Sequence, residues 1–183
     1  MEEILREKEQ DFHKSWERKH NKIRVWDCEK PVAFVFRIPE TELGFVHIKV
    51  ETEKSAIIDI HNSDHKDRDG TINGNTFAVR YELASGRYDL ITFEPMLVKY
   101  LKIIIRTEGK AVFLIPELLD YTYPDEQLCT FECSDGGLNK IYQGARRTLR
   151  LNTLDIFMDC PQRERGGWRS EEHTSELQSP RTI

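Results

Sequence analysis

The chain has 183 residues, a length typical of one domain or of one domain and part of another. Hydrophobic residues make up 38% and charged residues 32%, which leaves enough apolar material for a core. The net charge of -5, without a Lys/Arg cluster, provides no electrostatic surface for nucleic acid. No uncharged apolar run approaches the roughly 20 residues that cross a bilayer, so we expect no membrane partner.

The cysteines do not form a recognisable framework. They are too few for a disulfide scaffold, and Cys129 and Cys133 have no His or Cys partners at zinc-ligand spacing. The sequence therefore predicts no metal site and no cofactor. The four cysteines are Cys28, Cys129, Cys133 and Cys160.

The first segment, residues 1–30, is dense in charge and has Trp16 and Trp26 as its large apolar residues. We interpret it as a strap along a neighbouring domain or as a short helix. It suggests no function.

Residues 31–123 contain short β-rich runs separated by turn residues. Alternation is clear where Val46, Ile48 and Val50 interleave with more polar positions, which predicts one buried and one solvated face. Runs at this spacing are typical of an antiparallel β-sandwich. The predicted strands are 32–38, 45–50, 56–60, 76–81, 88–93, 98–105 and 111–115.

Glycine-containing turns separate several of these runs and are expected to supply the positive φ angles that hairpins need. They are Asp69-Gly70, Asn73-Gly-Asn75, Ser85-Gly86 and Glu108-Gly109.

After residue 124 the periodicity becomes helical. A stripe of residues at i, i+3 or i+4 spacing predicts a helix within 134–154, with Ser134 or Asp135 as its N-cap. Glycines in this segment disfavour an isolated helix, so packing must stabilise it. The stripe comprises Leu138, Ile141, Tyr142, Ala145, Leu149 and Asn152.

The segment 155–168 has the densest chemistry in the chain. Asp159 and Glu164 lie beside two arginines and Trp168, and Pro161 and two glycines make the segment a shaped loop. An acid flanked by arginine and tryptophan suits glycoside hydrolysis, in which one carboxyl protonates the leaving oxygen and another activates water. Salt-bridged structural turns have a similar composition and are, on composition alone, the more common explanation.

The string Asp159-Cys-Pro-Gln-Arg-Glu-Arg-Gly-Gly-Trp168 resembles the signature of the bacterial α-L-rhamnosidases of glycoside hydrolase family 78. Upstream, 93–101 and 131–149 are similar to the sandwich, linker and first barrel helix of that family. The resemblance covers about residues 30–168 and is specific only in the signature. It implies a mixed β-then-α chain: an antiparallel β-sandwich accessory domain at 31–123, then the first helix and loop of a truncated (α/α)6 barrel at 124–168.

The resemblance also implies roles for individual residues. Glu164 matches the proposed general acid, while Asp159, Arg163 and Trp168 match residues of the pocket that holds terminal rhamnose. The implied reaction is removal of α-L-rhamnose from a rhamnose-containing glycoside or polysaccharide with inversion by direct attack of water. In this family the general base comes from much later in the barrel, and this sequence contains no candidate for it.

Beyond Trp168 the sequence departs from the family. Residues 169–179 match the translation of a common short-read sequencing adapter, and we therefore predict that residues 169–183 are non-native. A natural polar tail is the alternative. An (α/α)6 barrel needs about 200 residues at ordinary helix and loop lengths, so we expect a catalytically inactive fragment of a larger enzyme. We also expect the helix stripe to fold back on the sandwich or to be exposed.

Three other interpretations remain open. The sandwich could be a carbohydrate-binding module that stacks sugar on Tyr81, Tyr88, Phe93 and Tyr100, although such rings usually belong to a core. The parent could be another six-hairpin glycosidase acting on a different sugar. Histidines and acids also occur together at His47, His61, His65, Asp59, Asp64, Asp67 and Asp69, where a solvated turn is a better interpretation than a metal site.

Overall fold

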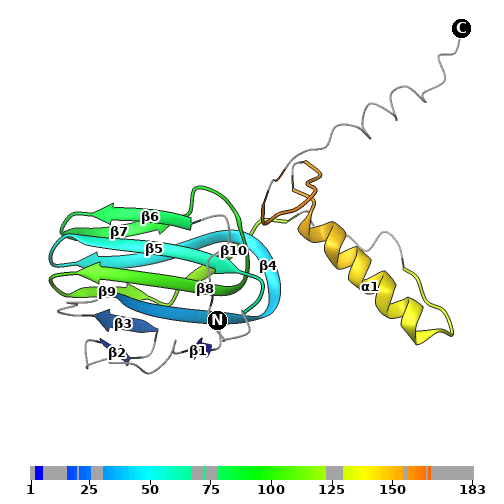
Figure 1. Cartoon of the computed structure of the whole chain (residues 1–183), viewed down its shortest axis with the longest axis horizontal. Coiled ribbons are helices and arrows are strands. Elements are labelled where there is room, and N and C mark those ends of the chain that lie inside the picture. Colours follow the sequence, from blue (N-terminus) through cyan, green and yellow to red (C-terminus); the bar gives the residue numbers. More distant parts are fainter. Residues whose placement is uncertain are drawn as a thin grey trace, which may run out of the picture. The chain divides into compact units, whose positions relative to one another are not determined.

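The computed structural model describes residues 3–5, 16–19, 21–25, 31–66, 72, 78–122, 130–154, 156–163 and 165 (Figure 1). The chain divides into two compact units, Met1–Tyr121 and Thr122–Ile183. The first unit contains the described strands and the second contains the described helix (Figure 1).

The first unit is built from antiparallel strands. The longest, β4, lies at the centre of the pairing and contacts five other strands. The strands are β1 (Glu3–Leu5), β2 (Trp16–Lys19), β3 (Lys22–Val25), β4 (Val32–Thr52), β5 (Ala56–Ser63), β6 (Ala78–Leu83), β7 (Gly86–Ile91), β8 (Met96–Thr107), β9 (Ala111–Leu114) and β10 (Glu117–Asp120).

Strand β4 takes part in both layers of the sandwich. Its first half pairs with β1 and β8, and β8 continues to β5 and β6. Its second half pairs with β7 on one side and with β9 and β10 on the other, and β9 continues to β3 and β2. The register with β8 shifts between Arg37 and Glu42, and the pairing with β8 then resumes from Glu42 to Gly44. The predicted antiparallel sandwich is confirmed.

The core lies between the two layers. Alternate residues of each strand point inward, as predicted for Val46, Ile48 and Val50, which are almost fully buried. The rings of Phe34 and Phe113, from β4 and β9, meet edge to face with centroids 5.3 Å apart. Because the cluster draws on strands of both layers, it fixes them together.

The structure differs from the sequence prediction in three places. The predicted strands 32–38 and 45–50 form one strand, β4, and β10 was not anticipated. In the charged N-terminal segment, β1, β2 and β3 form in place of a strap or helix. Ile23 and Val25 of β3 are fully buried, so this segment contributes to the core. Its apolar alternation is only two residues long, which is too short to recognise among charges.

The glycine turns are partly as predicted. Among the described glycines only Gly86 has a positive φ, 156°, and it begins β7 after the Ser85 turn. The prediction is wrong for Gly109, whose φ is not positive; a Cβ there would approach Lys54 Cγ at 3.0 Å. The turns at 69–70 and 73–75 lie outside the described residues.

Gly44 of β4 permits the close approach of β10. A Cβ at this position would lie 2.2 Å from the carbonyl oxygen of Leu119, and that atom belongs to backbone. We expect Gly44→Ala to displace β10 and to destabilise the sandwich by about 1–3 kcal/mol, as overpacking does. Hydrogen exchange of the Leu119 and Tyr121 amides, which face β4, is the measurement.

Gly144→Ala is the matched control, because nothing lies within 4 Å of a Cβ at Gly144. It should leave β10 protected and favour the helix by up to about 1 kcal/mol. Unchanged β10 protection in Gly44→Ala would contradict the packing described for this strand.

A buried carboxylate joins three strands on the outer face of one layer. Asp59 of β5, whose side chain is 7% exposed, accepts hydrogen bonds from Arg80 of β6 at 2.6 and 3.0 Å and from Arg106 of β8. The Arg80 hydrogen bonds, with help from Arg106, hold the pKa of Asp59 below its usual value despite burial. The contribution of Asp59 to stability is therefore present above its unfolded pKa and lost as the pH falls through its folded value.

Candidate active site

The helix of the second unit, α1 (Gly136–Leu151), begins at the predicted cap. Asp135 has extended backbone, and its carboxylate accepts hydrogen bonds from the amides of Gly137 at 2.7 Å and Leu138 at 3.3 Å. Asn139 exchanges two hydrogen bonds with the backbone of Cys133, at 2.8 and 3.0 Å. These contacts satisfy amides that the first helical turn leaves free and fix the direction from which the chain enters the helix.

We expect Asp135→Ala to destabilise α1 by about 1 kcal/mol, because no other acid lies in its first turn. Faster amide exchange at Gly137 and Leu138 is the measurement. Asp135→Asn, which keeps an acceptor oxygen, should lose much less. Equal losses in both variants would mean that the side-chain cap is not the source of the stability.

The predicted apolar stripe of α1 is exposed. Leu138, Ile141 and Leu149 are 49%, 68% and 58% exposed, and no described residue of the helix is buried. Within the second unit, the described residues therefore leave the stripe uncovered. An apolar face of this size is normally covered by other elements, so α1 has the character of one helix from a larger helical assembly.

The C-terminal end of α1 turns directly into the loop that precedes the signature. Asn152 is the C-cap, its side-chain amide donates to the carbonyl of Thr148 at 2.9 Å, and its own carbonyl accepts from the amide of Met158 at 2.8 Å. Thr153 and Phe157 form an antiparallel bridge between these ends. The residues 152–158 therefore form a closed loop that fixes where the signature begins. Met158 is buried, whereas Ile156 and Phe157 are exposed.

The described part of the signature continues as a compact turn. The carboxylate of Asp159 accepts from the amide of Cys160 at 2.7 Å, and Pro161 is buried. Arg165 adopts a left-handed conformation with φ 48°, and its Nε donates to the carbonyl of Pro161 at 2.9 Å. A non-glycine residue with this φ is uncommon, and here a side-chain bond to the turn accompanies it.

The structure covers two of the four predicted site residues. Asp159 and Arg163 are both exposed and lie four residues apart on this turn. Glu164 and Trp168 lie outside the described residues, so their predicted roles stay predictions.

Two residues that sequence reasoning did not assign to the site shape this loop. Arg165 closes the turn, and the signal for it was the second arginine of the Arg163-Glu-Arg165 run. Asn152 ties the helix end to Met158, and its Oδ1 is buried without a hydrogen-bond partner among the described residues. A pattern of helical periodicity placed Asn152 on an apolar stripe and gave no sign of its capping role.

The four rings considered as a sugar-stacking surface do not form one. Tyr81 and Tyr88 pack against the core, and Tyr100 lies under the ammonium of Lys66 at 5.2 Å. Phe93 is 79% exposed, but its nearest partner ring, Tyr81, is tilted by 36° at 5.8 Å. The rings therefore lack the common exposed plane that this interpretation needs.

The other candidate groups point to no ligand. Within the described parts of the chain, no group of three or more His, Cys, Asp or Glu side chains could hold a metal ion. Burial lowers the pKa of His61, and His65 contacts Asp64 at 2.5 Å. Asp67 and Asp69 lie outside the described residues. Over the same described ranges, no helix has the length and apolar character to span a membrane.

The known family that matches this chain matches a segment of the second unit. Residues 126–179 match the bacterial alpha-L-rhamnosidase 6 hairpin glycosidase domain. This segment is therefore similar to a domain of the bacterial α-L-rhamnosidases. The match covers α1 and the signature loop and runs beyond Trp168. The resemblance drawn from the sequence is thereby confirmed, and no curated protein sequence gives a significant match.

Solved structures agree with this relationship. A GH78 family rhamnosidase of Bacillus sp. GL1 is 25% identical with a TM-score of 0.67, over 82% of this chain and 16% of that one. An α-L-rhamnosidase from Dictyoglumus thermophilum has 22% identity and a TM-score of 0.53, over 84% of this chain and 19% of that one.

A third structure, a rhamnosidase from Klebsiella oxytoca with rhamnose bound, is 15% identical with a TM-score of 0.57, over 73% of this chain and 29% of that one. The last two similarities support the fold alone. The chain thus spans less than a third of each of these proteins.

Proposed function

We propose that this chain forms part of an enzyme that removes terminal α-L-rhamnose from rhamnosides with inversion. The observation that supports this proposal best is the rhamnosidase domain match over residues 126–179, the segment that contains α1 and the signature. The likeness of 82% of this chain to the 25% identical rhamnosidase also supports it.

In the proposed reaction Glu164 is the general acid. It protonates the glycosidic oxygen as the bond to the anomeric carbon breaks, while a second carboxylate deprotonates the attacking water on the opposite face of the sugar. That second carboxylate lies outside this chain. For a water to fit between them, the two carboxyl groups must stand roughly 6.5–9.5 Å apart.

Asp159, Arg163 and Trp168 are the proposed binding residues for the terminal sugar. The described geometry is compatible with this role for Asp159 and Arg163, because both are exposed on a turn whose backbone is fixed at Met158 and Pro161. Sugar hydroxyls are bound by such charge-assisted hydrogen bonds, and a tryptophan face packs on the apolar side of the ring.

The experiment that tests this function uses a longer polypeptide that contains these residues within a complete barrel. We expect it to release p-nitrophenol from the α-L-rhamnoside and not from the corresponding α-L-fucoside or β-D-glucuronide. Preference for either of the other sugars would favour another six-hairpin glycosidase. The 183-residue chain should show no hydrolysis, since it contains no candidate base.

A further inference from the structure

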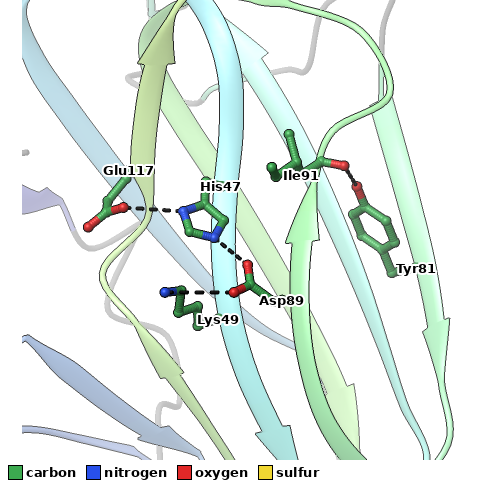
Figure 2. Close-up of polar contacts among 6 residues, drawn as sticks. All are labelled: His47, Lys49, Tyr81, Asp89, Ile91 and Glu117. Atoms are coloured by element: carbon green, nitrogen blue, oxygen red, sulfur yellow. Dashed lines mark hydrogen bonds and ion pairs between the residues drawn. The ribbon is translucent and has the colours of Figure 1, made fainter.

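His47 lies between two carboxylates on the outer face of the sandwich (Figure 2). Its Nε2 contacts Asp89 Oδ1 on β7, and its Nδ1 contacts Glu117 Oε2 on β10 at 3.2 Å. The imidazole is only 14% exposed, whereas Asp89 and Glu117 are 63% and 71% exposed. One ring on β4 therefore contacts the strands on both of its sides.

The chemistry of this arrangement depends on the protonation of the ring. A carboxylate accepts hydrogen bonds but cannot donate them, so each ring nitrogen needs its own proton to bond to its partner. The imidazolium has both protons, whereas neutral imidazole has one and would present a lone pair to the other carboxylate. The geometry fits the imidazolium.

The surrounding charges also favour this form. The Lys49 ammonium, on the same face of β4, lies 3.7 Å from Asp89 Oδ2 (Figure 2). With His47 protonated the group has two positive and two negative charges, and loss of the proton leaves one negative charge in excess. The hydrogen bond from His47, together with Lys49, lowers the pKa of Asp89, so this carboxylate stays ionised in mildly acidic solution.

The two strands joined by His47 are not equally secured. Strand β7 pairs with β4 over six positions from His47 to Thr52, and the Tyr81 hydroxyl donates to the carbonyl of Ile91 at its end (Figure 2). Strand β10 has only four paired positions, and its side chains are mostly exposed. Weakening the cluster should therefore affect β10 more than β7.

We propose that His47, Asp89 and Glu117 form a pH-sensitive clamp that fastens β10 to β4, closed when the imidazole is protonated and loosened when it is neutral. A neutral ring keeps one proton, so it can donate to only one of the two carboxylates, and β10, with fewer paired positions, is the strand that loosens. Strand β10 is the last strand before Thr122, where the second unit begins, so the clamp regulates the stability of the sandwich at the point where the chain leaves it.

The test is amide hydrogen exchange of the 183-residue chain between pH 5.5 and 8, corrected for the intrinsic pH dependence of exchange. We expect protection of the Leu119 and Tyr121 amides, which face β4, to fall about two- to fivefold more than that of β7 amides as the pH rises, the size expected for an exposed ion pair.

Glu117→Gln is the principal variant, because its exposed side chain can change without unfolding the sandwich. It should remove the pH dependence at β10. Glu51→Gln, which breaks a 3.1 Å pair with Arg87 on the same face, should retain it. A wild-type β10 whose corrected protection does not change with pH, or a Glu117→Gln variant that keeps the change, would overturn the clamp. So would imidazole nitrogen resonances of a neutral ring at pH 5.5.

Discussion

Glu164→Gln should lower kcat for rhamnoside hydrolysis by about 10²–10⁴-fold in the longer enzyme, the usual contribution of a general acid. Glutamine keeps the size of the side chain but cannot donate the proton in the same way, so KM should change little. The loss should be largest for alkyl rhamnosides, whose leaving groups need protonation, and much smaller for aryl rhamnosides with acidic phenols. Steady-state kinetics across such a series measures both effects.

Glu132→Gln is the matched control for this variant. Glu132 is an exposed carboxylate just before α1, and the substitution makes the same change in charge and shape away from the signature. It should leave kcat and KM unchanged. If the Glu164→Gln loss were the same for every leaving group, a binding or folding defect would explain it better than loss of the acid.

Phe113→Ala should destabilise the sandwich by about 3–5 kcal/mol, the usual result of emptying a large aromatic site in a core. Phe113 is 1% exposed, pairs with Phe34, and connects the layer containing β9 to the opposite layer. A loss of this size is a large fraction of the stability of an ordinary domain. The shift in denaturant midpoint, followed by hydrogen exchange in β8 and β9, is the measurement.

Phe93→Ala provides the comparison, because the same ring is removed from a site that is 79% exposed. Its effect should stay within about 0.5 kcal/mol, as for most surface substitutions. Similar losses in the two variants would mean that the core is not organised around Phe34 and Phe113 as the structure shows.

The sandwich could be predicted because a strand with one buried face has an apolar residue at every second position. In β4, β5 and β8 many of these positions hold β-branched residues. The elements that were missed have other causes. Strands β1, β2, β3 and β10 are three or four residues long, and pairing with β4, with β9 or, for β2, with β3 defines them more than their own sequence does. The gap between the predicted strands 32–38 and 45–50 contains Pro39, which falls where the register with β8 shifts, and β4 continues through it.

The candidate active site could be predicted from the sequence only in part. Capping chemistry is local, so Asp135 could be identified from its position before a helical stripe. The compact turn from Asp159 to Arg165 depends on Pro161 and on a side-chain bond across four residues, which a loop prediction cannot specify. A sugar pocket is assembled from several distant loops, so the placement of Glu164 relative to a base cannot be obtained from one segment.

The most direct test of the proposed function is time-resolved proton NMR of an α-L-rhamnoside during hydrolysis by the longer enzyme. It detects rhamnose release and the anomer formed first in one measurement. An inverting rhamnosidase must release β-L-rhamnose before mutarotation supplies the α-anomer. First appearance of α-L-rhamnose would contradict the inverting mechanism, and absence of rhamnose would contradict the proposed function itself.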